Sequence, residues 1–383
     1  MRIWAKRLGL GLLAVVVIAG AGALWKREEL TRLMAVNSLF APDRMVQNFS
    51  HMDRAFLSVP LTTEAGPPLP RGTAVPLPEG ADRWIEDRRI TGLVVLHDGA
   101  ITHESYYLGT GPDDLRISWS VAKSFLSLLT GLLVTEGALK LDDQVVLHAP
   151  ELDGSAYDGA SVRDVLQMES GVAFNEDYFD KGSDINRMGR VIALGGALDD
   201  FTAALKQRDR DPGGAWKYVS MDTHVLGMVL RGATGRAIPE LMTDRLLVPM
   251  GIGPAYYLTD GEGVAFVLGG LNMRTVDYAR MGLLVQQDGI LNGRQVVPTA
   301  WVRESTQPSA RTEPGKLQYG YQWWMPKDAT PDEIMAQGVY GQFVYIDRAR
   351  EVVIAVTAAD PDFRKPGVSD AMVEMFRRIA AAQ

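Results

Sequence analysis

The sequence contains no cysteine, and this absence removes several kinds of chemistry at once. Disulfide bonds, thiolate metal sites, iron–sulfur clusters and a cysteine nucleophile all require a thiol. Histidine is scarce, with five residues in 383, and no two of them stand four positions apart on a candidate zinc-binding helix. Phosphate-binding loops and dinucleotide-binding glycine motifs are also missing from the sequence. We therefore expect neither a metal ion nor a cofactor.

An excess of positive charge is absent as well. Lys and Arg number 39 and Asp and Glu number 47, which gives a net charge of -8. Such a chain is not suited to binding nucleic acid over its whole surface, so no nucleic-acid partner is expected. Hydrophobic residues make up 46% and charged residues 22%, as in globular proteins with a large buried core.

A long uncharged apolar run occurs once, over residues 8–25, directly after a basic start. Eighteen helical residues span about 27 Å, close to a hydrocarbon core of about 30 Å. We interpret the run as a membrane anchor; the alternatives are a signal peptide cleaved near 21–23 and a buried helix. The positive-inside rule then predicts a single-pass protein of the cell membrane with its catalytic domain on the periplasmic side, or a secreted protein after cleavage.

Proline and apolar periodicity divide the chain into three segments. Residues 1–30 hold the anchor or signal, residues 31–80 form a helical arm and a proline-rich connector, and residues 81–383 form the folded domain. Within this domain, the pattern of apolar residues over 146–260 predicts mainly helices and loops. Closing strands and a final helix are predicted after residue 318.

Two apolar runs near the start of the domain predict a β-hairpin. They cover Ile90–Leu96 and Ile101–Leu108, and Asp98-Gly99 stands between them as a strong turn signal. Strands are thus expected at both ends of the domain, with helices between them. This order predicts an α+β fold in which an antiparallel sheet is flanked by helices and an all-helical region is inserted.

The string Ser120-Val121-Ala122-Lys123 opens a segment predicted to be a buried helix. Helical spacing of three residues puts the Ser120 hydroxyl and the Lys123 amine on one face, and the free N–H groups of the helix start suit a developing oxyanion. Burial lowers the pKa of a lysine, so that Lys123 could accept the serine proton. The alternative is a helix-capping serine beside a lysine that reaches solvent.

Two further segments carry groups of the right chemistry. Tyr218-Val219-Ser220 precedes a predicted helix, and an ammonium beside Tyr218 would favour its phenolate and a proton relay. The segment 338–342 leads into a predicted strand, where a backbone N–H group could be a second oxyanion donor. A half-buried structural tyrosine and an ordinary turn are the respective alternatives.

In this order the motifs SVAK, YVS and VYG resemble those of the serine β-lactamase/penicillin-recognising hydrolase family, in its class C-like branch. They look most like those of 6-aminohexanoate-dimer hydrolases and related esterases. The resemblance, from about residue 81 onward, implies a β-lactamase-like fold, an acylated Ser120, and proton transfer by Lys123 and Tyr218. It implies an oxyanion hole made of the N–H groups of Ser120 and Gln342. It also implies substrate contacts from Tyr178, Ser220, Asn272, Tyr340 and Gly341.

The third motif departs from the family pattern. Val339 stands where the family carries a lysine that binds the carboxylate of a β-lactam or of peptidoglycan, and Tyr340 is bulky. This favours a serine hydrolase that cleaves a small amide or ester through an acyl-serine intermediate. The alternatives are a peptidoglycan-directed D,D-carboxypeptidase or weak β-lactamase, and a catalytically silent binding protein of the same fold.

Overall fold

The computed structural model describes residues 27–383, and antiparallel sheets organise this part of the chain. The large sheet has the strand order β3-β2-β13-β12-β11-β10-β9, the smaller sheet has the order β1-β5-β6-β4, and β7 pairs with β8. The strands are β1 (Leu57–Leu61), β2 (Ile90–His97), β3 (Ala100–Tyr106), β4 (Arg116–Ile117), β5 (Ala255–Thr259), β6 (Leu271–Met273), β7 (Ile290–Leu291), β8 (Arg294–Gln295), β9 (Gln318–Tyr319), β10 (Trp324–Met325), β11 (Glu333–Gly338), β12 (Gln342–Asp347) and β13 (Val352–Ala358).

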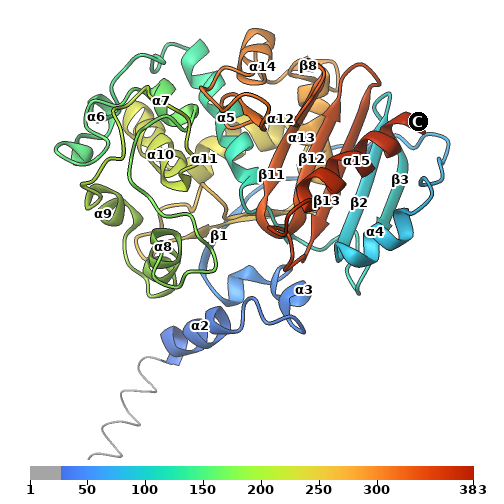
Figure 1. Ribbon diagram of the computed structural model, residues 1–383, viewed down its shortest axis with the longest axis horizontal. Coiled ribbons are helices and arrows are strands. Elements are labelled where there is room, and N and C mark those ends of the chain that lie inside the picture. Colours follow the sequence, from blue (N-terminus) through green and yellow to red (C-terminus); the bar gives the residue numbers. More distant parts are fainter. Residues whose placement is uncertain (1–26) are drawn as a thin grey trace, which may run out of the picture.

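Helices cover both faces of the large sheet and fill the region beside it (Figure 1). They are α2 (Arg27–Asn37), α3 (Met45–Asn48), α4 (Ala81–Asp87), α5 (Val121–Thr135), α6 (Val145–His148), α7 (Val162–Leu166), α8 (Asp184–Ala193), α9 (Leu198–Ala203), α10 (Ser220–Thr234), α11 (Ile238–Met242), α12 (Val248–Met250), α13 (Thr275–Gln286), α14 (Thr299–Ser305) and α15 (Val368–Ala381). Shorter turns are η1 (Met52–Arg54), η2 (Pro150–Leu152), η3 (Thr243–Leu247) and η4 (Val339–Gly341).

The predicted hairpin forms and joins the two ends of the domain. Strands β2 and β3 pair across Asp98 and Gly99, whose φ values of 47° and 73° are the left-handed values that a tight hairpin turn needs. Strand β2 also pairs with β13, near the end of the chain. The expected α+β fold, with an antiparallel sheet flanked by helices, is therefore confirmed.

Each face of the large sheet has its own helical cover. On one face α4 and α15 pack together, with the rings of Trp84 and Phe376 at 6.0 Å between centroids. On the other face α13 approaches the strands so closely that a Cβ atom at Gly282 would lie 2.4 Å from Val353. A glycine is required at this contact, because any side chain there would push α13 off the sheet.

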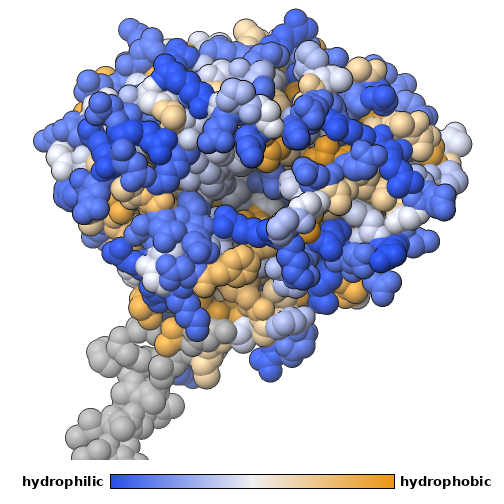
Figure 2. Space-filling view, viewed as in Figure 1, coloured by the Kyte–Doolittle hydropathy of each residue, from blue (hydrophilic) through white to orange (hydrophobic). Residues whose placement is uncertain are grey.

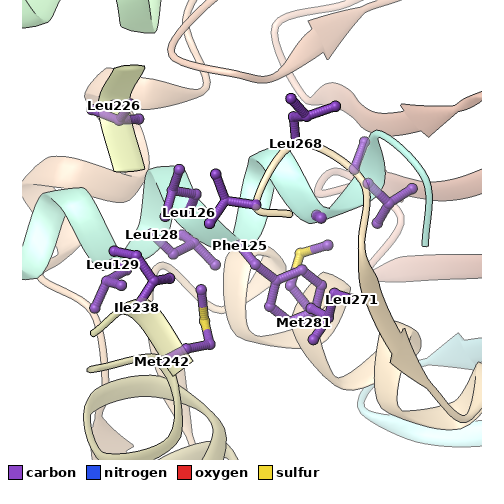
Figure 3. Close-up of a cluster of buried hydrophobic side chains, with 14 of the residues drawn as sticks. Phe125, Leu126, Leu128, Leu129, Leu226, Ile238, Met242, Leu268, Leu271 and Met281 are labelled. Carbon is purple, nitrogen blue, oxygen red and sulfur yellow. The ribbon is translucent and has the colours of Figure 1, made fainter. Parts of the chain in front are cut away.

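Helix α5 runs through the middle of the main core. Its apolar residues surround the helix, as a fully buried helix requires. Figure 3 shows Leu126, Leu128 and Leu129 among side chains of α10 and α11, while Phe125 lies beside Met281 of α13. The start of α5 is thereby anchored on several sides, which fixes the position of Ser120.

Two segments contain structure that the sequence did not predict. Within residues 146–260, predicted to be helices and loops, residues 255–259 form β5 of the smaller sheet. Within residues 31–80, predicted to be an arm and a connector, residues 57–61 form β1, which pairs with β5. Most of the proline-rich stretch after β1 has no regular structure, as proline predicts.

The predicted single-pass membrane topology needs correction. Among residues 27–383, no helix combines the length and apolar character needed to cross a bilayer. The buried apolar helix α5 has 15 residues, about 22 Å of helix against a hydrocarbon core of about 30 Å. The predicted anchor, residues 8–25, lies outside the described residues. The predicted cell-membrane location with a periplasmic catalytic domain has no support in the described residues and is not retained.

Candidate active site

Ser120 stands at the start of α5, directly after a residue with a strained backbone. Trp119 has a φ of 42°, a left-handed value that costs a non-glycine residue roughly 1 kcal/mol. The Ser120 side chain makes no capping hydrogen bond to the helix, although the residue occupies the N-cap position. Its Oγ lies 3.0 Å from Nζ of Lys123 instead. The hydroxyl is thus directed to an amine and not to the helix backbone.

Lys123 is buried, with 2% of its surface exposed. Besides its contact with Ser120, Nζ donates a hydrogen bond to the carbonyl oxygen of Leu268 at 2.7 Å. Burial lowers the pKa of Lys123 to about 7, while the carboxylates of Glu176 and Asp222 act in the opposite direction. Near neutral pH a large share of this amine is uncharged, as a proton acceptor must be. The alternative of a lysine that reaches solvent is excluded by this burial.

Tyr218 is the third side chain of the candidate site, next to Ser120 and Lys123. The centre of its ring lies 5.4 Å from Nζ of Lys123. Burial and then the charge of Glu176 raise the pKa of the phenol, while hydrogen bonding with the hydroxyls of Ser120 and Ser220 lowers it. The expectation that the neighbouring lysine would favour a phenolate was wrong, because burial and the negative charge of Glu176 raise the pKa of the phenol. Tyr218 therefore keeps its proton at neutral pH and can donate it.

Glu176 is a residue of this site that sequence reasoning missed. One carboxylate oxygen accepts a hydrogen bond from the backbone N–H of Ser220, at the start of α10. The other accepts from the Ser220 hydroxyl at 3.2 Å and from the Tyr178 hydroxyl at 3.1 Å. A chain of polar contacts thus runs from Glu176 through Ser220 to Tyr218 and Ser120. Its only signal in the sequence was its place two residues before Tyr178.

The third motif lies against the start of α5. A Cβ atom at Gly338 would come within 2.7 Å of the Ser118 carbonyl oxygen and 3.1 Å of the Ser120 nitrogen. Gly338 also pairs with Gln342 across the β11–β12 turn. The side chain of Gln342 is buried and donates to the carbonyl oxygens of this turn and of Ala358. The two backbone segments predicted to form the oxyanion hole are therefore neighbours.

Tyr340, predicted to contact substrate, lies in an aromatic cluster. Its φ of 60° is left-handed, and its ring is 9% exposed. The ring stacks on Phe40 at 5.0 Å between centroids, meets Phe49 at 5.4 Å and Phe363 at 4.6 Å, and lies 5.9 Å from Trp119. We call Phe40, Phe49, Trp119, Tyr340 and Phe363 the aromatic cluster. Its packing leaves little of the Tyr340 ring exposed to a substrate.

The remaining predicted substrate residues fall into two groups. Ser220 and Tyr178 both bind Glu176 and belong to the cluster around Tyr218. Asn272 is completely buried on β6, where its Nδ2 donates to the Gly270 carbonyl oxygen at 2.8 Å. Gly341 has a φ of 88°, and a Cβ atom there would lie 2.9 Å from the Cβ atom of Ala358. A substrate contact by Asn272 or by Gly341 stays a prediction.

A cavity of about 540 Å³ opens beside Tyr218 and Glu176. Its lining includes Lys217, which forms an ion pair with Asp209, so that its charge is already matched. Figure 2 shows this face of the molecule hollowed near its centre, between the helical region and the large sheet as they are placed in Figure 1. The cavity thus reaches Tyr218 and Glu176, whereas Ser120 and Lys123 are not among its lining residues.

The described residues offer no set of metal ligands. Within residues 27–383, no group of three or more His, Asp or Glu side chains is arranged to hold a metal ion. The chemistry available at the cluster is that of a hydroxyl with a partly neutral amine and a protonated phenol next to it. Such a set can activate a serine for attack on a carbonyl carbon and return a proton to a leaving group.

Comparisons with known proteins agree with this chemistry. The profile of the family described as Beta-lactamase matches residues 81–375. A 6-aminohexanoate-dimer hydrolase from Paenarthrobacter ureafaciens is 28% identical over 304 residues, which cover 76% of this chain and 77% of the relative.

Solved structures share the fold at lower sequence identity. A provisionally named 6-aminohexanoate-dimer hydrolase from Bacillus anthracis has a TM-score of 0.77 and 20% identity, covering 89% of this chain and 95% of its own. EstCE1, a hydrolase with promiscuous acyltransferase activity, has a TM-score of 0.62 and 15% identity, covering 79% and 95%. A family VIII carboxylesterase has a TM-score of 0.61 and 14% identity, covering 82% and 99%.

Proposed function

Because this chain belongs to the beta-lactamase family, whose relatives here are hydrolases, we propose that it cleaves a linear amide or ester through an acyl intermediate on Ser120. The observation that carries the proposal is the 3.0 Å contact between Ser120 Oγ and the buried amine of Lys123, whose pKa is lowered to about 7. A serine hydroxyl is a weak nucleophile alone and needs such a neighbour to take its proton.

Acylation then follows from the roles of three side chains. Neutral Lys123 takes the proton of Ser120 as Oγ bonds to the substrate carbonyl carbon. The resulting oxyanion accepts hydrogen bonds from the backbone N–H groups of Ser120 and Gln342. Tyr218 donates its proton to the leaving amine or alcohol, and the bond to that group breaks. Lys123 then returns a proton to Tyr218.

Deacylation uses the same groups in reverse order. Water enters beside the acyl-serine, and neutral Lys123 accepts one of its protons, directly or through the hydroxyl of Tyr218, as the water oxygen bonds to the acyl carbon. The oxyanion again lies between the two backbone donors. Collapse of the second intermediate releases the carboxylic acid and returns the proton to Ser120 Oγ.

The nucleophile is tested by covalent labelling. A fluorophosphonate should modify the full-length chain at Ser120, as located by mass spectrometry of the adduct, and Ser120→Ala should abolish both labelling and turnover. Ser127→Ala is the matched control, because it removes a hydroxyl of the same helix that has no hydrogen-bond partner among residues 27–383. A label on another serine would overturn the assignment of Ser120 as the nucleophile, and an unlabelled wild type would support the silent binding protein instead.

The proton-transfer pair is tested by a double-mutant cycle. We expect Lys123→Ala and Tyr218→Phe each to lower kcat/KM by at least about 100-fold, the usual scale of general acid–base catalysis. Residues that act as one unit are strongly non-additive, so the double variant should be little worse than the poorer single one. Losses that multiply in the double variant would contradict a shared relay.

Substrate class is tested with three probes: p-nitrophenyl esters, linear amides and a chromogenic cephalosporin. Because Val339 leaves the strand of the third motif without the lysine that binds the ring carboxylate of a β-lactam, we expect ester or linear amide turnover to exceed cephalosporin turnover by at least about 10-fold. Efficient cephalosporin hydrolysis would favour the β-lactamase or carboxypeptidase alternative.

A further inference from the structure

The loop between β13 and α15 carries one positive charge that its neighbours leave unmatched. In this loop Asp360 pairs with Arg88 at 3.0 Å, and Asp362 pairs with Lys365 at 2.7 Å. Arg364 lies between these paired groups with its side chain exposed, and within residues 27–383 it forms neither an ion pair nor a hydrogen bond. Its guanidinium group is therefore free to bind an anion.

Aromatic rings hold this guanidinium beside the candidate active site. Its central carbon lies 4.7 Å from the ring centre of Tyr178 and 6.0 Å from that of Phe363. Tyr178 donates to Glu176 in the cluster around Tyr218, and Phe363 packs against Tyr340 of the third motif. Arg364 thus lies next to Tyr178, which contacts the Glu176 carboxylate, and next to Phe363, which contacts the third motif.

The charge of Arg364 reaches the reacting groups. It lowers the pKa of Tyr218 and that of Tyr340, against the larger effect of burial on both phenols. Glu176, the carboxylate of the candidate site, already accepts hydrogen bonds from Ser220 and Tyr178 with its two oxygens. A carboxylate that enters with a substrate would therefore meet an unmatched cation at this place.

The surrounding residues leave Arg364 as the candidate cation for such a carboxylate. Val339 occupies the position where the third motif would otherwise place a lysine. Lys123 is buried against Ser120, and Lys217 is paired with Asp209. A guanidinium stacked on a ring keeps its N–H edge available, and that edge matches the two oxygens of a carboxylate.

We propose that Arg364 binds a free carboxylate of the substrate, so that the enzyme acts on linear amides or esters that carry an anionic end group. This inference rests on the proposed function for the position of the scissile bond, but the binding of the carboxylate itself does not require turnover. The cation comes from the loop after β13, in place of the strand position occupied by Val339.

The first experiment compares matched substrates. The first pair differs on the acyl side: mono-p-nitrophenyl glutarate carries a carboxylate there, and its methyl ester is the neutral counterpart. The second pair differs on the leaving group: it consists of the butyrate ester of 3-hydroxybenzoate, which is anionic, and the butyrate ester of methyl 3-hydroxybenzoate, which is neutral. For the full-length wild type we expect kcat/KM to favour the anionic member of at least one pair. Arg364→Gln should lower this preference by at least about 10-fold.

A charge-matched control is available on α4. Arg83→Gln removes one positive charge from an 86% exposed side chain outside the cluster, and it should keep the wild-type preference. Arg364→Lys should restore only part of the preference, since an ammonium lacks the planar fork. An unchanged preference in Arg364→Gln, or an equal loss in Arg83→Gln, would overturn the proposal.

The second experiment measures binding without turnover. Calorimetric titration of Ser120→Ala with N-hexanoylglycine and with its methyl ester should show tighter binding of the anion, and adding Arg364→Gln should remove that difference. If the anion binds through Arg364 but no ester or amide is cleaved by wild type, the proposed function fails and this inference stands. If substrates are cleaved but neither measurement depends on Arg364, only this inference fails.

Discussion

The buried amine of Lys123 makes acylation depend on pH near neutrality. In the proposed mechanism the neutral form of Lys123 accepts the proton, and burial lowers the pKa of this amine to about 7. Below this pH the ammonium form dominates and acylation slows; above it the rate should level off. The carboxylate of Glu176 stabilises the ammonium form and therefore holds the pKa above the value that burial alone would give.

Replacing Glu176 with glutamine should shift the pH dependence in a defined direction. Glu176→Gln removes the negative charge, the ammonium of Lys123 loses stabilisation, and its pKa falls further. The acidic limb of the kcat/KM profile should then move to lower pH, by about 0.5 units or more for one nearby charge. Initial rates of p-nitrophenyl ester cleavage between pH 5 and 9, at constant ionic strength, measure this shift.

Asp177→Asn is the matched control for this change, because it removes one negative charge from an exposed side chain next in sequence. Its profile should keep the wild-type limb. If the acidic limb of the kcat/KM profile stays in place in Glu176→Gln, or moves to higher pH, the electrostatic role given to Glu176 is contradicted.

At the scale of single residues, local spacing was predictable and distant contacts were not. The contact between Ser120 and Lys123 follows from a three-residue spacing on one helix. The contact between Glu176 and Ser220 joins residues 44 positions apart, and no local sequence pattern predicts it. Tyr340 was expected at the substrate because of its motif. Its left-handed backbone and its aromatic neighbours place its ring in the aromatic cluster.

At the scale of elements, the aromatic cluster joins the two turns of the predicted oxyanion hole to the segment before residue 81. Trp119 precedes Ser120 and Tyr340 lies two residues before Gln342, and both have left-handed φ values that cost energy. Phe40 stacks on both rings, at 6.1 Å from Trp119 and 5.0 Å from Tyr340. This packing stabilises two strained turns whose backbone N–H groups are proposed to bind the oxyanion.

Removing this stack should slow acylation. In Phe40→Ala we expect the rate of fluorophosphonate labelling and kcat to fall roughly 3- to 10-fold, with a loss of about 1 kcal/mol in the free energy of unfolding from lost aromatic contacts. KM should change less than kcat, because the oxyanion donors act mainly in the transition state. Met34→Ala, which truncates a 64% exposed side chain on α2, is the control and should keep both values. An unchanged labelling rate in Phe40→Ala would contradict the support given by the cluster.

Elements with strong local signals were predictable, and those defined by distant partners were not. The β2–β3 hairpin follows from an Asp-Gly turn between apolar runs. Strand β1 contains Pro60, which argues against a strand in sequence. The strand forms because β1 is an edge of the smaller sheet, where a missing N–H group is tolerated, and because β5, almost 200 residues later, supplies its partner.

At the scale of the whole molecule, the segment before residue 81 completes the core of the hydrolase fold. Arg116 is 1% exposed on β4, and one of its guanidinium nitrogens donates to the Val46 carbonyl oxygen and to Ser50 Oγ, each at 2.6 Å. The N–H of Ile117 donates to the Phe49 carbonyl oxygen at 3.1 Å. The family profile begins at residue 81, so none of these contacts lies within the matched region alone.

A chain that begins at residue 81 should therefore be much less stable than the full chain. It loses β1 from the smaller sheet, and the Arg116 guanidinium loses both of its hydrogen-bond acceptors, the Val46 carbonyl oxygen and Ser50 Oγ; in the full chain burial already lowers the pKa of this guanidinium to about 10. Leaving a buried charge unpaired costs about 3–5 kcal/mol, a large fraction of the stability of an ordinary protein. Thermal unfolding followed by circular dichroism should show a Tm lower by about 10 °C or more, or no cooperative transition.

Adding Arg116→Met to the truncated chain separates the effect of the unpaired guanidinium from the effect of losing β1. The substitution removes the buried charge and keeps most of the side-chain volume, so it should recover part of the lost Tm if the unpaired guanidinium is responsible. In the full chain the same substitution discards the contacts with Val46 and Ser50, and its effect should be smaller or of opposite sign. A truncated chain that melts at the temperature of the full chain would show that residues 81–383 fold on their own, and that the segment before residue 81 does not contribute to their stability.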